Sequence, residues 1–121
     1  MEPNNEFFEI EQHGESMILT PNADMGELDH ERISVGMKKV LEALEQAPTV
    51  KNLVLDFHRT TYYGSTALGY FVRLWKTICT RRGRMAFCNL SDHEREILTI
   101  TRLDNLWAIC GSRDEALKSV G

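Results

Sequence analysis

The sequence predicts an α/β sandwich with a mixed, mostly parallel sheet, an N-terminal antiparallel hairpin and about four helices. Short apolar stretches typical of strands alternate with longer stretches in which apolar residues recur at helical spacing. The first two apolar stretches are separated only by Gly14-Glu15, as in a hairpin. Strands that alternate with helices favour a parallel sheet, because parallel neighbours need helical crossovers on the faces of the sheet.

The N-terminal half contains two strands, a helix and a third strand. The stretch "FFEIEQHGESMILTP" predicts the hairpin, with its turn within residues 13–16. Asp29 is a suitable N-cap for a helix over residues 29–46, which ends before Pro48. The stretch "VKNLVLDF" is a nearly continuous apolar run and predicts a strand that is covered on both faces.

The next segment is the clearest amphipathic helix of the sequence. We expect this helix over residues 66–82, with Arg73 on its exposed side and Gly83 as its C′ residue. The third strand and this helix must cover each other. We therefore expect six of their residues to be largely buried: Leu53, Leu55, Leu68, Phe71, Val72 and Trp75.

The remaining sequence predicts two more strands and two more helices. The stretches "RMAFCNL" and "LWAIC" are typical of strands. Helices are expected over residues 92–101, with Ser91 or Asp92 as the cap, and over residues 113–120. The sequence contains no repeat, low-complexity tract or linker, so we expect a single domain over residues 1–121.

Composition narrows the function classes. The 121 residues are 42% hydrophobic and 26% charged, as in a globular protein rather than a disordered one. The net charge of −4 argues against direct nucleic-acid binding, which usually needs a basic face. No apolar run is long enough for a membrane span, and the first residues do not resemble a signal peptide. We therefore expect a cytoplasmic protein without membrane contact.

The cysteine and histidine patterns predict neither a disulfide framework nor a metal site. Cys79, Cys88 and Cys110 are odd in number and far apart, which favours reduced thiols in or near the core. The four histidines have no metal-ligand spacing to one another or to the cysteines. We therefore expect no metal and no other cofactor.

The loop after the third predicted strand leads to two adjacent hydroxyl residues, Ser65 and Thr66. Neither the glycines of a nucleophile elbow nor the Lys of a P-loop is present around them. A Ser-His-Asp arrangement with His58 and Asp56 is an alternative. We instead expect Asp56 to close the strand, and His58 and Arg59 to lie in solvent. Ser65 is a suitable N-cap for the following helix, a role that is compatible with phosphorylation.

From about Leu53 to Leu117 the sequence resembles the STAS domain of anti-sigma-factor antagonists. The resemblance is carried by an apolar strand that ends in Asp, the stretch "GSTALG", an amphipathic helix and a terminal "EAL" helix. At the positions of "GSTALG", the family signature reads Asp-Ser-Ser/Thr-Gly-Leu-Gly. Gly64 therefore replaces the signature Asp, and Ala67 replaces its first Gly. The resemblance implies a STAS-like fold.

The resemblance also implies a function. Such antagonists are regulatory binding modules without catalytic activity, which bind an anti-sigma factor or serine kinase and release it when phosphorylated. Ser65 aligns with the phosphorylated serine, and Thr66 is the alternative acceptor. The tyrosines near this loop have two equally supported interpretations, which are anchors at a partner interface and residues packed in the core. The expected partner-binding residues are Gly64, Ser65, Thr66, Tyr62, Tyr63 and Arg73.

Two other functions remain open. One is a STAS interaction or scaffold domain that has lost the phosphorylation switch, which Gly64 in place of Asp suggests. The other is a small enzyme or ligand carrier that uses the Ser65 loop, although the sequence shows no catalytic spacing there. If the chain is an antagonist, its expected partners are proteins, namely an anti-sigma factor or a serine kinase. Weak self-association of the chain also remains open.

Overall fold

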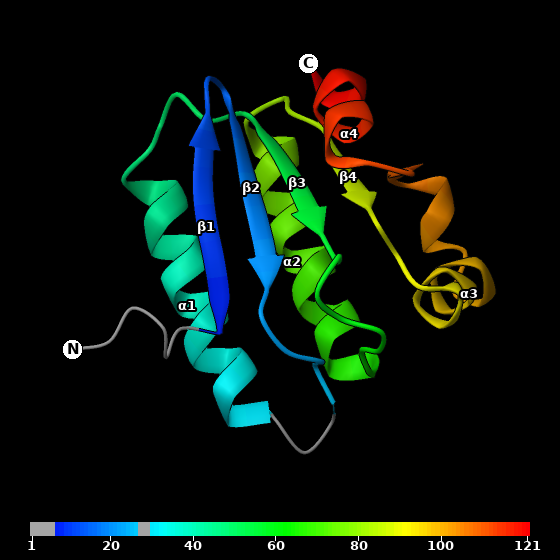
Figure 1. Ribbon diagram of the computed structural model, residues 1–121. Helices are drawn as coiled ribbons and strands as arrows, with labels where there is room; N and C mark the ends of the chain where they lie inside the picture. Colours follow the sequence, from blue (N-terminus) through cyan, green and yellow to red (C-terminus); the bar gives the residue numbers. More distant parts are fainter. Residues whose placement is uncertain (1–6, 27–29) are drawn as a thin grey trace.

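The computed structural model describes residues 7–26 and 30–121 and has the predicted order of elements (Figure 1). Within these described residues, five strands form one sheet in the order β1-β2-β3-β4-β5. The first pair is antiparallel and the other pairs are parallel, which confirms the mixed sheet with a hairpin at its edge. The strands are β1 (Phe8–His13), β2 (Ser16–Pro21), β3 (Asn52–Asp56), β4 (Met85–Cys88) and β5 (Ala108–Cys110).

The four predicted helices lie within two residues of their expected bounds. They are α1 (His30–Glu45), α2 (Ser65–Thr80), α3 (Asp92–Ile100) and α4 (Arg113–Val120). Ser91 caps α3 in a reciprocal capping box with Glu94, as one of the two predicted alternatives. Asp29, the predicted cap of α1, lies outside the described residues. A short 3-10 helix, Leu103–Asn105, was not predicted.

Helices cover both faces of the sheet. α1 and α2 lie side by side on one face, and α4 lies on the other (Figure 1). The larger core fills the space between the sheet and α1, α2 and α3, whereas the smaller core lies under α4. Val54 and Leu55 of β3 point to opposite faces and are both 0% exposed. The prediction of a strand covered on both faces is therefore confirmed.

The buried side of α2 differs from the prediction. Its buried residues form one row at helical spacing: Ala67, Phe71, Leu74 and Ile78. Three residues that we expected in the core are only half-buried: Leu68, Val72 and Trp75. Three others are fully buried as predicted: Leu53, Leu55 and Phe71. The apolar arc of α2 is wider than its buried row, so periodicity alone did not identify the row that faces the sheet.

The end of α2 also differs from the prediction. The residue with left-handed backbone is Arg82, with φ of 60°, and not Gly83. Gly83 is required for a steric reason instead, because a Cβ atom there would collide with the carbonyl oxygen of Lys51. The glycine was thus correctly placed at the end of the helix, but for the wrong reason.

Candidate functional site

Ser65 is the first residue of α2 and is exposed, after the loop that leaves the carboxyl end of β3. Gly64 is the N-cap residue and has no side chain that could cap the helix, so the predicted capping role of Ser65 is wrong. No acidic residue occupies the first turn of α2. The positive end of the helix dipole therefore favours negative charge at this position, including that of a phosphate group.

Thr66 is less accessible than Ser65. Its side chain is half-buried and lines a cavity of about 250 Å³ at the N-terminal end of α2. Arg73 lies two turns further along α2, is exposed and lines the same cavity. Of the two adjacent hydroxyls, that of Ser65 is thus easier for a second protein to reach.

The segment after β2 fixes the loop that precedes α2. Gly64 N donates a hydrogen bond to Met25 O at 2.9 Å, and Met25 N donates to Tyr62 O at 3.2 Å. The carboxylate of Asp24 accepts hydrogen bonds from the backbone N–H groups of Thr61 and Tyr62, at 2.8 and 3.4 Å. Sequence reasoning missed Asp24 and Met25, because no motif marks this segment and its contacts are with residues far along the chain.

The two tyrosines of this loop have different environments. Tyr63 is 0% exposed, and its hydroxyl donates a hydrogen bond of 2.7 Å to the carbonyl oxygen of Glu94. Burial raises the pKa of Tyr63 above its ordinary value. Of its two interpretations, core packing and an anchoring role, the side chain of Tyr63 fits core packing. Tyr62 is 36% exposed, and its ring centre lies 5.2 Å from that of His93 on α3.

Glu94 connects α3 to the same loop from inside the molecule. Its side chain is buried and accepts hydrogen bonds from Thr60 Oγ1 at 2.6 Å and from Ser91 N at 2.9 Å. Burial raises the pKa of Glu94, and the hydrogen bonds from Thr60 and Ser91 only partly oppose this effect. In addition, Ser91 Oγ donates to Thr61 O at 2.7 Å. The loop is thus held between α3 and the segment after β2.

Asp56, the last residue of β3, is buried within a polar network. Its carboxylate accepts hydrogen bonds from Arg113 Nε at 3.0 Å, Asn89 Nδ2 at 2.9 Å and His58 N at 3.1 Å. Burial by itself would raise the pKa of Asp56. The hydrogen bonds from Asn89, His58 and Arg113 outweigh burial and hold this pKa below its usual 3.8.

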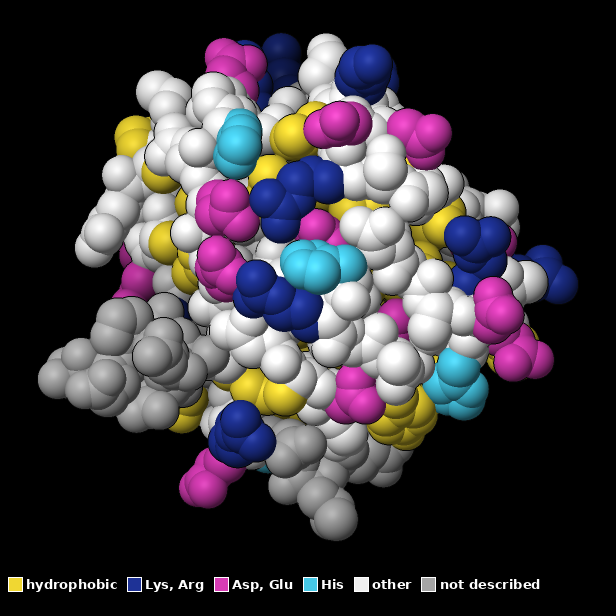
Figure 2. All heavy atoms as spheres, viewed as in Figure 1, with side chains coloured by type: hydrophobic (Ala, Val, Ile, Leu, Met, Phe, Trp, Pro, Cys, Tyr) yellow, Lys and Arg dark blue, Asp and Glu magenta, His cyan; other side chains and the backbone are white. Residues whose placement is uncertain are grey.

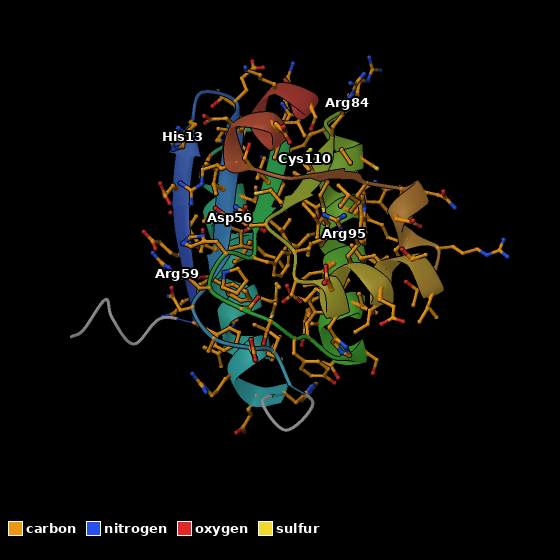
Figure 3. The ribbon with its side chains drawn as sticks, turned by 45° about the vertical axis from the view of Figure 1, so that its right-hand side comes forward. His13, Asp56, Arg59, Arg84, Arg95 and Cys110 are labelled. Carbon is orange, nitrogen blue, oxygen red and sulfur yellow. The ribbon has the colours of Figure 1, made fainter. Side chains whose placement is uncertain are left out.

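Ion pairs also reach β1, the strand at the edge of the sheet. Arg113 lies 3.4 Å from the carboxylate of Glu11, and Arg59 donates to Glu9 at 2.7 Å. Figure 2 shows cationic, acidic and His side chains gathered on the face that it views, and Figure 3 shows Arg59 beside the start of β1. His58 and Arg59 are exposed as predicted. Asp56 does more than close the strand, because it helps to hold α4 on the sheet.

The chain offers little chemistry for metal or thiol catalysis within residues 7–26 and 30–121. No group of three or more His, Cys, Asp or Glu side chains there could hold a metal ion. Burial and the nearby Asp56 raise the pKa of Cys88 to about 12, so its thiol stays protonated. Cys110 is half-buried and Cys79 is exposed, so the near-core prediction is wrong for Cys79. Among these residues, no helix is long and apolar enough to cross a membrane.

Comparison with known proteins identifies a family. The model of the STAS domain family matches residues 7–116. A candidate anti-sigma factor antagonist from Thermotoga maritima superposes with a TM-score of 0.81 at 21% identity, over 93% of each chain. An anti-sigma-factor antagonist (STAS) domain protein from Planctomyces limnophilus has a TM-score of 0.79 at 21% identity, over 93% of this chain and 96% of that one.

A third similar structure is a phosphorylated protein. The cell fate determinant SpoIIAA of Bacillus, in its phosphorylated form, has a TM-score of 0.69 at 19% identity, over 93% of this chain and 97% of that one. At such identities, the likeness to these solved structures shows the fold.

Proposed function

Because the chain belongs to the STAS domain family, we propose that it is an anti-sigma-factor antagonist that phosphorylation at Ser65 switches off. The observation that carries this proposal is the position of Ser65, which is exposed in the first turn of α2 at the carboxyl end of β3. The protein acts by binding and is not an enzyme. Its partners are an anti-sigma factor or a serine kinase, which it meets in the cytoplasm as a single domain without contacting nucleic acid directly.

The switch is a phosphoryl transfer that the partner kinase catalyses. The hydroxyl oxygen of Ser65 forms a bond to the γ-phosphorus of ATP, the bond from that phosphorus to ADP breaks, and the hydroxyl proton passes to a base of the kinase. The product carries a further charge of about −1.5 to −2. The N-terminal end of the α2 dipole stabilises this charge, so the helix stays folded. The partner is released because charge and bulk change at the contact surface.

The proposed contact surface surrounds Ser65. Tyr62 contributes an exposed aromatic ring, which packs against the ring of His93. Thr66 and Arg73 extend the surface along α2, whereas Gly64 is buried and joins the loop to the helix. Tyr63 supports this surface from the core, because its hydrogen bond to Glu94 O holds the loop against α3.

Gly64 favours a second candidate function, a STAS interaction domain without a switch. An Asp at this N-cap position would add a carboxylate beside the acceptor hydroxyl, and the chain has none there. If a kinase recognises that carboxylate, its loss removes phosphorylation but leaves the binding surface intact. The domain would then bind its partner constitutively.

The test is to incubate the purified protein with ATP and each anti-sigma-type serine kinase encoded in the same genome, and to map phosphate by mass spectrometry. We expect phosphate on Ser65, none on Ser65→Ala, and nearly normal phosphorylation of Thr66→Val. Absence of phosphate from all three proteins, together with kinase binding that is equal for wild type, Ser65→Ala and Ser65→Asp, would contradict the switch and favour the constitutive domain.

A further inference from the structure

A shallow groove is lined by residues of both α1 and α2. These two helices begin at the same end of the molecule (Figure 1). Two neighbouring cavities of about 250 and 220 Å³ form it and share Tyr70 and Arg73 as lining residues. The first cavity begins at Thr66, directly beside Ser65, and the second continues along α1 past Met37. The groove is therefore continuous with the proposed contact surface around Ser65.

The walls of this α1–α2 groove are basic, although the whole chain has a net charge of −4. Among residues 7–26 and 30–121, its lining includes Lys38 and Arg73 together with His30, and no acidic residue. The guanidinium carbon of Arg73 lies 5.5 Å from the ring centre of Tyr70. This stacking holds the cation at the groove without neutralising its charge. Such a groove selects a negatively charged partner by electrostatic complementarity.

Gly69 leaves a hollow in the groove that the fold itself does not require. A Cβ atom at Gly69 would meet no atom within 4 Å, and its backbone does not have the positive φ that favours glycine. Alanine is more favourable than glycine inside a helix. Neither packing nor backbone conformation therefore explains this glycine. The absence of a side chain keeps space open between Thr66 and Arg73, one turn after Ser65.

We infer that the α1–α2 groove binds an acidic segment of the partner protein, with one carboxylate side chain in the hollow over Gly69 and close to Arg73. The inference rests on the proposed function, because it takes this partner to be the protein that is released on phosphorylation. A phosphate on Ser65 adds negative charge at the end of the groove and repels the acidic segment. This repulsion gives the switch a physical mechanism that needs no change of fold.

The groove is tested first without the partner, by NMR titration of the 15N-labelled protein with a hexaglutamate peptide and a hexalysine control. Arg73→Glu and Lys76→Glu are matched variants, because both reverse one positive charge on α2 and Lys76 lines neither cavity. We expect hexaglutamate to shift groove resonances, to bind Arg73→Glu about tenfold more weakly, and to bind Lys76→Glu within about twofold of wild type. Shifts elsewhere on the protein, or equal losses in both variants, overturn the inference.

The steric part of the inference has its own variants. Gly69→Leu fills the hollow, and Gly69→Ala fills less of it. Circular dichroism checks that the helix remains folded in Gly69→Ala. Hexaglutamate binding should weaken from wild type to Gly69→Ala to Gly69→Leu. Unchanged affinity in both variants overturns the hollow as the carboxylate site.

Measurements with the partner kinase separate this inference from the proposed function. If Ser65→Asp weakens kinase binding while Arg73→Glu and Lys76→Glu bind the kinase equally well, the proposed function stands and the groove inference fails. If no kinase binds or modifies the protein but hexaglutamate still selects the groove, the proposed function fails, and the groove remains supported as a site for acidic segments.

Discussion

Arg113, the first residue of α4, donates a hydrogen bond from Nε to Oδ2 of Asp56 at the end of β3, over 3.0 Å. The Asp56 side chain is only 3% exposed, whereas that of Arg113 is 30% exposed. This pair joins α4 to β3, the strand whose following loop leads to Ser65. It therefore connects the stability of α4 to the geometry of the candidate site.

Replacing Arg113 by Met should remove this connection and leave the buried carboxylate of Asp56 without its cation. We expect a loss of about 1.5–3 kcal/mol in the free energy of unfolding, the usual range for a hydrogen bond to a charged group. Chemical denaturation measures this loss. Arg95→Met on the exposed side of α3 is the control and should change stability by less than about 0.5 kcal/mol. Equal effects of the two substitutions would show that the Asp56 contact contributes little.

The lowered pKa of Asp56 predicts a pH dependence of stability. Since this pKa lies below its unfolded value of 3.8, the stabilisation is present above pH 3.8 and is lost as the pH falls through the folded pKa. Asp56→Asn should therefore be less stable than wild type at neutral pH, by an amount that shrinks in acid. Urea unfolding of both proteins from pH 7 to pH 2 measures the difference. A gap that stays constant over this range would contradict the account of Asp56.

The raised pKa of Glu94 predicts a pH dependence of stability that is opposite in sign to that of Asp56. Between the unfolded value of 4.5 and the higher folded pKa, the folded protein holds a proton that the unfolded chain has lost, so the contribution of Glu94 to stability falls as the pH rises. Glu94→Gln lacks this titration and should gain stability relative to wild type over the same interval. Thermal unfolding in matched buffers from pH 4 to pH 8 checks the trend. A relative stability that does not change with pH would contradict it.

Gly69 and Gly83 should respond oppositely to alanine. A Cβ atom at Gly69 has open space, so Gly69→Ala should stabilise the protein by about 0.5–1 kcal/mol through helix propensity. At Gly83 the same atom would collide with the carbonyl oxygen of Lys51, so Gly83→Ala should destabilise it. Denaturant midpoints of the two variants test both signs in one experiment. Destabilisation by Gly69→Ala would mean that the fold itself needs this glycine.

Local patterns in the sequence predicted most of the fold. Strand and helix order, the hairpin and the capping of α3 by Ser91 all depend on residues close to one another along the chain, and the structure confirms them. The buried row of α2 was missed because Ala67 and Leu74 face the sheet beside an equally apolar row that does not. Which of two neighbouring rows becomes buried depends on the tertiary packing of the helix.

The candidate site was less predictable, because it depends on contacts between distant residues. Asp56 and Arg113 are separated by 57 positions, and Asp24 reaches a loop 37 positions away. Tyr63 follows Tyr62 directly, yet one ring is buried and the other lies at the surface. A single sequence does not distinguish these two environments. The position of Ser65 at the start of α2 was predictable to one residue, because the preceding strand and glycine mark that boundary.

We propose that phosphate on Ser65 controls partner binding. The most direct test of this control is the affinity of the cognate anti-sigma factor or kinase for the unmodified protein and for protein fully phosphorylated at Ser65, measured by calorimetry at the same ionic strength. We predict that phosphorylation weakens binding at least about tenfold, or about 1.4 kcal/mol, while Ser65→Ala binds like the unmodified protein. Equal affinity of the phosphorylated and unmodified forms would contradict the account.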